Sequence, residues 1–140
     1  MHHQVYIYLN SSSHLEFFPD NSSNKFTSLL PEGLRLEGDW EVGLVQIQYP
    51  ASRRSAEVTF QTDIIEDTIF EDTKRPVLRK INLVPRAKSL TFHPVFYKPV
   101  KNPQINEISI YIYNNRGELH SFTGETLKCT LHFRKCLLNG

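Results

Sequence analysis

The residues of this chain that could do chemistry are its histidines, cysteines and carboxylates, which serve as metal ligands, nucleophiles or general acids and bases. Of the six histidines, His2 and His3 are at the terminus, His14 is in a polar loop, and the other three do not cluster in sequence. His132 falls on the outward parity of a predicted strand, where a surface or intersubunit position is favoured over a metal ligand. The acidic run from Asp63 to Asp72 lacks the Asp-x-Asp-x-Asp-Gly register of a calcium loop, which favours a solvated edge.

The two cysteines, Cys129 and Cys136, are too few to staple a secreted fold and have no second pair nearby to suggest zinc. Cys129 lies on an inward parity and Cys136 lies beyond the strand, so we expect no disulfide between them. Cys136 could be a reactive thiol, although an ordinary tail cysteine is favoured. The sequence has no Gly-x-Ser-x-Gly, phosphate-binding glycine loop or His-Glu-x-x-His motif. We therefore predict no enzyme activity, no cofactor and no metal.

The elements that would position any site are strands, because apolar residues recur with period two. In residues 107–113, "EISIYIY", three isoleucines share one face, while Tyr111 and Tyr113 share the other with polar residues. The following "NNRGE" predicts a tight reversal and a β-hairpin. Residues 4–10 and 128–134 alternate in the same way. On this basis Leu131→Asp is expected to unfold the protein, whereas His132→Asp is expected to be tolerated.

Residues 36–50, "LEGDWEVGLVQIQYP", contain a change of apolar parity within one strand. Trp40, Val42 and Leu44 alternate, and the apolar positions then move to the opposite parity. Such a switch predicts a β-bulge, or a strand covered on both faces, and Gly43 beside it fits a bulge or a close backbone approach. Trp40 is expected to be a packing anchor, with an exposed contact residue as the alternative. The predicted core residues are Trp40, Val42, Leu44, Ile108, Ile110, Ile112, Leu131 and Phe133.

Further short strands are expected near residues 57–62, 77–84 and 89–92. The segment "DIIEDTIFEDTK", residues 63–74, also fits one or two helical turns, although its β-branched content argues against a helix. About eight short strands separated by turn signals predict an all-β antiparallel sandwich or barrel.

The chain has 140 residues and a net charge of +1, which predicts a single domain and gives no basic field for nucleic acid. The start, "MHHQVYIYLN", lacks the features of a signal peptide, and no apolar run has the length of a membrane helix. We therefore expect a soluble protein of a reducing compartment, with no membrane contact and no specific nucleic-acid contact.

Five segments occur in the order of a known family: "FPDNSSNKFTSLLP", "LEGDWEVGLVQIQYP", "FYKPV", "NEISIYIYNNRGELHSFTGE" and "LKCTLHFRK". From about Val5 to Lys135 the chain resembles the minor capsid, or penton, proteins of Polinton/Maverick-type elements and adintoviruses. The most specific pieces are Asp39–Leu44 and Leu131–Arg134. The chain resembles a short form, because only "ASRRSAEV" follows Pro50 where the family carries a long middle region.

The resemblance implies a single jelly-roll β-sandwich of about eight antiparallel strands over residues 1–140. It also implies homopentamers at the five-fold vertices of a virion, next to a major capsid protein with a double jelly-roll fold. Tyr111 and Tyr113 are the candidate interface residues, because tyrosine is enriched in contact surfaces; ordinary strand surface is the alternative. A different class of function, a monomeric module that binds carbohydrate or peptide through its loops, fits the same scaffold. That module could be a host-domesticated copy.

Overall fold

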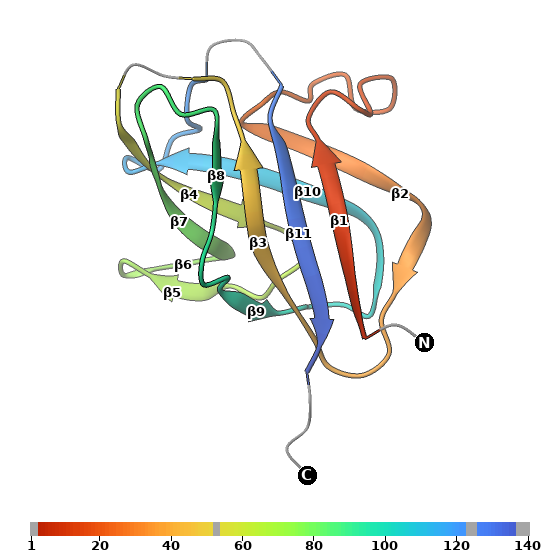
Figure 1. The fold of residues 1–140 in the computed structure, drawn as a ribbon. Coiled ribbons are helices and arrows are strands. Elements are labelled where there is room, and N and C mark those ends of the chain that lie inside the picture. The colour runs from red at the N-terminus through yellow and green to blue at the C-terminus, as the bar shows by residue number, and fades with distance from the viewer. Residues whose placement is uncertain (1–2, 52–53, 123–125, 137–140) are drawn as a thin grey trace.

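The chain folds as an all-β sandwich of two facing antiparallel sheets, which confirms the predicted fold class (Figure 1). The computed structural model describes residues 3–51, 54–122 and 126–136. Within these ranges there are eleven strands and no helix. The two sheets are called the front sheet and the back sheet below, after their positions in Figure 1.

The front sheet has the strand order β1, β11, β3, and both β8 and β9 then pair with β3. The chain's first strand is therefore the direct neighbour of its last strand. Pairing between β1 and β11 is continuous from Gln4 opposite Arg134 to Asn10 opposite Lys128. The strands of this sheet are β1 (Gln4–Asn10), β11 (Lys128–Lys135), β3 (Trp40–Gln48), β8 (Ser89–Thr91) and β9 (Tyr97–Pro99).

The back sheet has the strand order β2, β10, β4, β7. A separate hairpin of β5 and β6 lies between β4 and β7 in the chain. The strands concerned are β2 (Lys25–Arg35), β10 (Gln104–Asn114), β4 (Ala56–Thr62), β7 (Val77–Leu83), β5 (Thr68–Phe70) and β6 (Thr73–Arg75).

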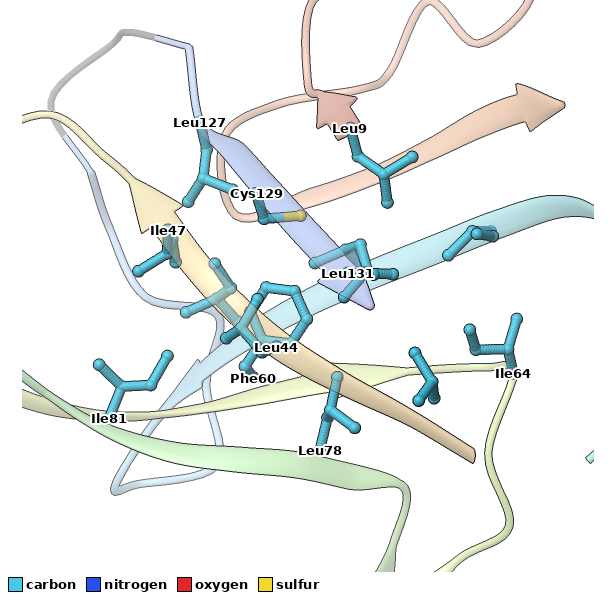
Figure 2. Close-up of a cluster of buried hydrophobic side chains, with 14 of the residues drawn as sticks. Leu9, Leu44, Ile47, Phe60, Ile64, Leu78, Ile81, Leu127, Cys129 and Leu131 are labelled. Atoms are coloured by element: carbon cyan, nitrogen blue, oxygen red, sulfur yellow. The ribbon is translucent and has the colours of Figure 1, made fainter. Parts of the chain in front are cut away.

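The hydrophobic core fills the space between the two sheets. Figure 2 shows Leu44 and Leu131 of the front sheet facing Phe60 and Leu78 of the back sheet. Each such side chain contributes about 1.5–3 kcal/mol when it leaves water completely, so this layer is the main source of stability. Seven of the predicted core residues are completely buried: Val42, Leu44, Ile108, Ile110, Ile112, Leu131 and Phe133.

Trp40, the eighth predicted core residue, lies at the margin of this layer. Its ring is half-buried and packs against the core cluster, while the indole N–H donates a hydrogen bond to the Glu37 carbonyl at 2.9 Å. The alternation correctly predicted that Trp40 lies on the core-facing side of β3. It is only partly covered because it is the first residue of the strand, at the end of the sandwich.

The parity switch in β3 is a β-bulge, as predicted. Leu131 lies opposite Leu44, but Thr130 lies opposite Gln46, so Val45 is the extra residue. Gly43 makes the expected close approach: a Cβ built there would lie 2.4 Å from a Val95 methyl carbon. Any side chain at position 43 would therefore displace the segment that leads into β9.

The segment from residue 63 to residue 75 contains no helix, and β5 and β6 form a hairpin instead. Glu71 and Asp72 have φ angles of +47° and +66°, which is the backbone geometry of a two-residue hairpin turn. The β-branched content, which argued against a helix, therefore agreed with the structure and the helical spacing did not. Ile64 and Ile65, which precede the hairpin, are buried in the core.

The hairpin predicted after β10 is present as a reversal at Asn114–Gly117, where Gly117 has a φ of +79°. Its second arm is limited to one bridge, between Tyr113 and Leu119. Besides β5 and β6, two strands were not predicted, β2 and β9. Both contain proline and lack a clean alternation, and their partners in the sheets hold them extended.

Candidate functional site

The surface with the most exposed aromatic area on regular strands is the outer face of the front sheet, which points away from the back sheet. Tyr6 and Tyr8 of β1 lie on it, with 49% and 75% of their surface exposed. On the neighbouring β11, Thr130, His132 and Arg134 share this face because residues two apart along a strand point the same way. The face divides into two halves with different chemistry.

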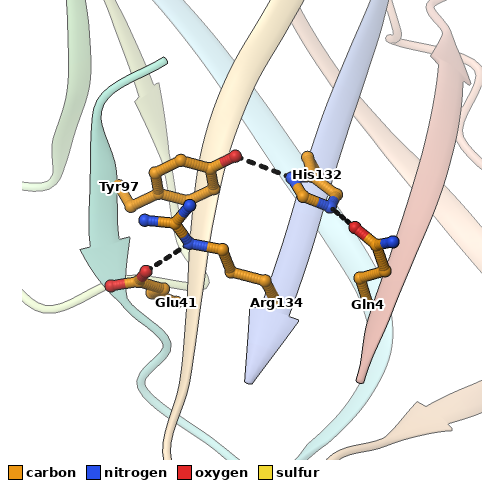
Figure 3. Close-up of polar contacts among 5 residues, drawn as sticks. All are labelled: Gln4, Glu41, Tyr97, His132 and Arg134. Carbon is orange, nitrogen blue, oxygen red and sulfur yellow. Dashed lines mark hydrogen bonds and ion pairs between the residues drawn. The ribbon is translucent and has the colours of Figure 1, made fainter. Parts of the chain in front are cut away.

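One half is the His132 cluster, which comprises Gln4, Tyr6, Glu41, Tyr97, His132 and Arg134. Figure 3 shows Tyr97 and Gln4 on opposite sides of the imidazole ring. The Tyr97 hydroxyl lies 2.7 Å from His132 Nδ1, and Gln4 Oε1 lies 2.8 Å from His132 Nε2. The ring of Tyr6 stacks on the imidazole with a centroid separation of 4.4 Å. Three side chains from two other strands, β1 and β9, therefore enclose one histidine of β11.

The prediction that His132 is a wet surface residue is wrong, because only 7% of it is exposed. Its outward parity was assigned correctly. What alternation could not indicate is that Tyr6 from β1 stacks on the imidazole ring and Tyr97 from β9 makes an edge contact with it. His132→Asp would place a carboxylate in this enclosed position, so tolerance of that substitution is no longer expected.

The hydrogen bonds define the tautomer of His132. The Gln4 carbonyl oxygen can only accept, so His132 Nε2 carries the proton and donates to it. His132 Nδ1 then accepts from the Tyr97 hydroxyl. Burial lowers the pKa of His132, and the positive charge of Arg134 lowers it further. The neutral imidazole is thus the form that the site favours, and both of its nitrogens are satisfied within the chain.

Arg134 completes the cluster on the side of β3 and β9. Its guanidinium carbon lies 3.5 Å from the centroid of the Tyr97 ring, and its Nε donates to a carboxylate oxygen of Glu41. The hydrogen bond to Glu41 raises the pKa of Arg134. Glu41 and Arg134 are also cross-strand partners in the ladder between β3 and β11. The imidazole of His132 and the Nε group of Arg134 are therefore both engaged by neighbouring side chains.

The other half of the face is the open polar patch, which comprises Tyr8, Gln46, Gln48, Lys128 and Thr130. These residues line a shallow pocket of about 350 Å³. Among the described residues, no side chain of the patch makes a hydrogen bond or an ion pair with another group. The patch therefore offers amide, ammonium and hydroxyl groups to a ligand beside one exposed aromatic ring.

Tyr111 and Tyr113, the candidate interface residues, lie on the outer face of the back sheet. They are half-buried, and their rings stack with a centroid separation of 6.4 Å and an interplanar angle of 20°. The ammonium group of Lys25 lies 6.0 Å from the Tyr111 ring centroid. The structure thus places this pair on the opposite side of the sandwich from Tyr6 and Tyr8. A role for it in an interface stays a prediction.

The remaining candidates for chemistry do not come together. In the ranges that the structure describes, no three histidine, cysteine, aspartate or glutamate side chains are grouped so that they could hold a metal ion. Cys129 is buried, which raises the pKa of its thiol, and Cys136 is half-exposed; both are free. His2 lies outside the described residues. None of the described segments forms a helix with the length and hydropathy needed to cross a membrane.

Sequence reasoning missed Gln4, Tyr6 and Tyr97 as neighbours of His132. Gln4 and His132 are 128 positions apart, and no local pattern connects them. The only usable signal was the alternation that places Tyr6 on the outward side of its strand. Alternation predicts the side of the sheet on which a residue lies, but not which residues of other strands lie beside it.

No model of a known protein family and no curated protein matches this sequence. The class of protein that the fold defines is an all-β antiparallel sandwich. Its two outer faces carry aromatic and polar side chains.

Proposed function

We propose that this chain is a structural virion protein, a penton-like minor capsid subunit. Five copies would form a ring at a capsid vertex and contact a major capsid protein with a double jelly-roll fold. In this role the protein is a structural subunit of the capsid, so it needs no catalytic residue. Its place of action is the capsid vertex, after assembly inside a host cell.

The observation that carries the proposal is the strand order. The front sheet runs β1, β11, β3, then β8 and β9, and the back sheet runs β2, β10, β4, β7. Successive strands of the two sheets lie in opposite sheets, except that β4 and β7 pair within the back sheet and β8 and β9 both pair with β3 in the front sheet. A chain that winds across two sheets in this way, with its first and last strands adjacent, supports a jelly roll, the architecture of many capsid subunits.

The pieces that carry the resemblance to penton proteins also support the proposal by their positions. Asp39–Leu44 begins at the start of β3, and Leu131–Arg134 forms the end of β11. Leu131 is the ladder partner of Leu44, and Phe133 is the partner of Val42. The two most specific pieces, far apart in sequence, are thus side by side in the front sheet and share the core. Fold alone does not imply function, so assembly is the decisive test.

The test is the mass of the purified protein by light scattering across a concentration series, followed by co-assembly with candidate major capsid proteins. A five-subunit species, or density for this chain at the vertices of imaged particles, is expected. A chain that remains monomeric and never occupies a five-fold position in such particles contradicts the proposal.

A second candidate function, a module that binds carbohydrate or peptide, is favoured by the open polar patch. Tyr8 could stack on a sugar ring, while Gln46, Gln48 and Lys128 could donate hydrogen bonds to its hydroxyl groups. Screening against glycan and peptide arrays would test this function. Binding that is lost in Gln46→Ala and Tyr8→Ala but retained in Tyr111→Ala would support it, and no binding in the arrays would remove it.

A further inference from the structure

Sheet edges present unpaired backbone groups, and proteins usually protect them with proline, bulges, charges or short strands. Three of the four edges here have such protection. In β2, Pro31 lies within a bulge of four residues opposite Asn106. In β7, Arg79 and Lys80 supply charges, and Leu78 is bulged. At the edge formed by β8 and β9, each strand has only three residues.

The fourth edge, β1, has none of these devices. Its seven residues, "QVYIYLN", include no charge, no proline and no glycine. Its pairing with β11 has no register shift, so the strand is not bulged. It is also the outermost strand of the front sheet on its side (Figure 1).

The backbone groups that β1 leaves free can be assigned from the ladder. The Ser11 amide donates to the Leu127 carbonyl, and the Lys135 amide donates to the His3 carbonyl, each across a directly opposed pair. Hydrogen-bonded pairs alternate along an antiparallel ladder, so odd-numbered residues of β1 bond to β11. The N–H and C=O groups of Gln4, Tyr6 and Tyr8 therefore point away from β11. None of the backbone hydrogen bonds between described residues outside the ladders uses them.

The sequence of β1 is symmetric by residue class about Ile7. Reading outward, Ile7 is flanked by two tyrosines, then by two aliphatic residues, then by two amides. An antiparallel copy centred on Ile7 would place Tyr6 opposite Tyr8, Val5 opposite Leu9, and Gln4 opposite Asn10. Every cross-strand pair would then join like with like. Tyr6 and Tyr8, whose backbone groups are free, would form the central hydrogen-bonded pairs, whereas the Asn10 carbonyl at the end of the strand already accepts a hydrogen bond from the Ser13 amide.

We propose that β1 pairs with β1 of a second copy of this chain, antiparallel and with a two-fold axis at Ile7. The front sheets of the two copies join into one continuous sheet, and the four tyrosines form two cross-strand pairs on its outer face. Self-complementarity of the strand and the lack of any charge on it select a second copy over an unrelated partner. The contact is isologous, so it closes as a dimer.

This two-fold contact does not depend on the five-fold ring. A ring of five uses a contact between two different patches, so in a ring the two copies of Ile7 do not meet. The β1 contact would operate between rings or before ring assembly. An experiment that reports on Ile7 itself therefore distinguishes the two modes of association.

The first test is disulfide trapping in a Cys136→Ser background, which removes the half-exposed thiol. Ile7→Cys places two thiols at a non-hydrogen-bonded pair, where Cα atoms are about 4.5 Å apart and a disulfide fits. Val5→Cys is the matched control: it is also half-buried and inward-facing, but in this register its two copies are roughly 13 Å apart. We expect a covalent dimer of Ile7→Cys and none of Val5→Cys. Equal trapping of both variants, or of neither, overturns the proposed pairing.

The second test measures self-association without a cross-link. In sedimentation experiments across a concentration series, Tyr8→Lys should weaken dimerisation about tenfold, because it removes both tyrosine pairs and adds an edge charge. Phe17→Lys, at a residue that is 60% exposed in a loop, should leave dimerisation unchanged. Hydrogen exchange should show that the amides of Tyr6 and Tyr8 gain protection with concentration, while those of Val5 and Ile7 stay protected throughout. A monomer at all concentrations, with unprotected Tyr6 and Tyr8 amides, overturns the proposal.

Discussion

The two halves of the outer face of the front sheet differ in how their polar groups are satisfied. In the His132 cluster, Gln4 and Tyr97 engage both ring nitrogens, and Glu41 engages Arg134. In the open polar patch, Gln46, Gln48, Lys128 and Thr130 line a pocket without intramolecular partners among the described residues. Both halves are built from outward-facing residues of β1, β3 and β11, and the His132 cluster also includes Tyr97 of β9. The comparison therefore indicates that neighbouring strands and loops, not alternation, decide which outward residues are structural and which remain available to a partner.

The largest loss of stability is expected from a substitution on the inner face of β11, which faces the core beneath this outer surface. Leu131→Asp should unfold the protein, because it replaces a completely buried leucine by an unpaired carboxylate and costs about 4 kcal/mol or more. Thr130→Asp, one residue earlier but in the open patch, should keep the fold. Circular dichroism melts of the two variants check this. Similar losses of melting temperature in both would contradict the assignment of faces.

A smaller but clear effect is expected inside the His132 cluster. His132→Ala should lower the free energy of unfolding by about 1–3 kcal/mol, because it leaves the Tyr97 hydroxyl and the Gln4 carbonyl without their partner. Thr130→Ala, on the same strand and face, should change the free energy of unfolding by less than about 0.5 kcal/mol. Urea unfolding measures both.

A double-mutant cycle attributes this difference to the network. Tyr97→Phe should cost stability in the wild-type background and less in the His132→Ala background, because the two residues share one hydrogen bond. If the changes in free energy of unfolding of the two single variants add up to that of the double variant, the hydrogen bond contributes no stability. In that respect the His132 cluster would then not differ from the open polar patch.

The pH dependence of stability should separate the two halves as well. Burial and Arg134 lower the pKa of His132 below its usual value, so the unfolded chain binds a proton there more readily than the folded protein does. The stabilisation is complete above the unfolded pKa, near 6.5, and is lost as the pH falls through the lower folded pKa. Unfolding measured at pH 7.5 and at successively lower pH should show a decline that is reduced in His132→Gln.

His120 must be controlled in this experiment, because burial also lowers its pKa. The variant His120→Gln removes that contribution, and the decline that remains belongs to His132. If His132→Gln leaves the slope unchanged in that background, the imidazole is not held neutral by the cluster.

The smallest effect is expected from labelling the cysteines with a thiol reagent, which should not change the stability of the protein. Cys136 should be labelled in the native protein, whereas Cys129, buried on the inner side of the strand that carries the open patch, should react only after unfolding. Counting thiols in denaturant without reductant should find both free, because Cys129 lies on the inner side of β11 and Cys136 lies beyond the end of that strand. Rapid native labelling of Cys129 would indicate that the patch opens to the core.

The strands β1, β3, β4, β7, β8, β10 and β11 were predictable because their alternation is local. The bulge in β3 was also predictable, since a change of parity cannot be accommodated in a regular ladder that has one buried face. By contrast, β2 was not recognised, because Pro31 and Gly33 interrupt its pattern. It is held extended by β10, from which it is separated by about seventy residues in the sequence.

The sequence by itself determined the all-β class and the inner faces of the strands, because the two-residue period of a strand relates each side chain directly to the core. Only the tertiary structure decided which outward residues are covered. His132 is enclosed because Gln4 and Tyr97, 128 and 35 positions away, are brought beside it by the sheet order. The same order leaves β1 with a free edge. Long-range pairing carries no local signature, so these properties follow from the fold and not from the residues alone.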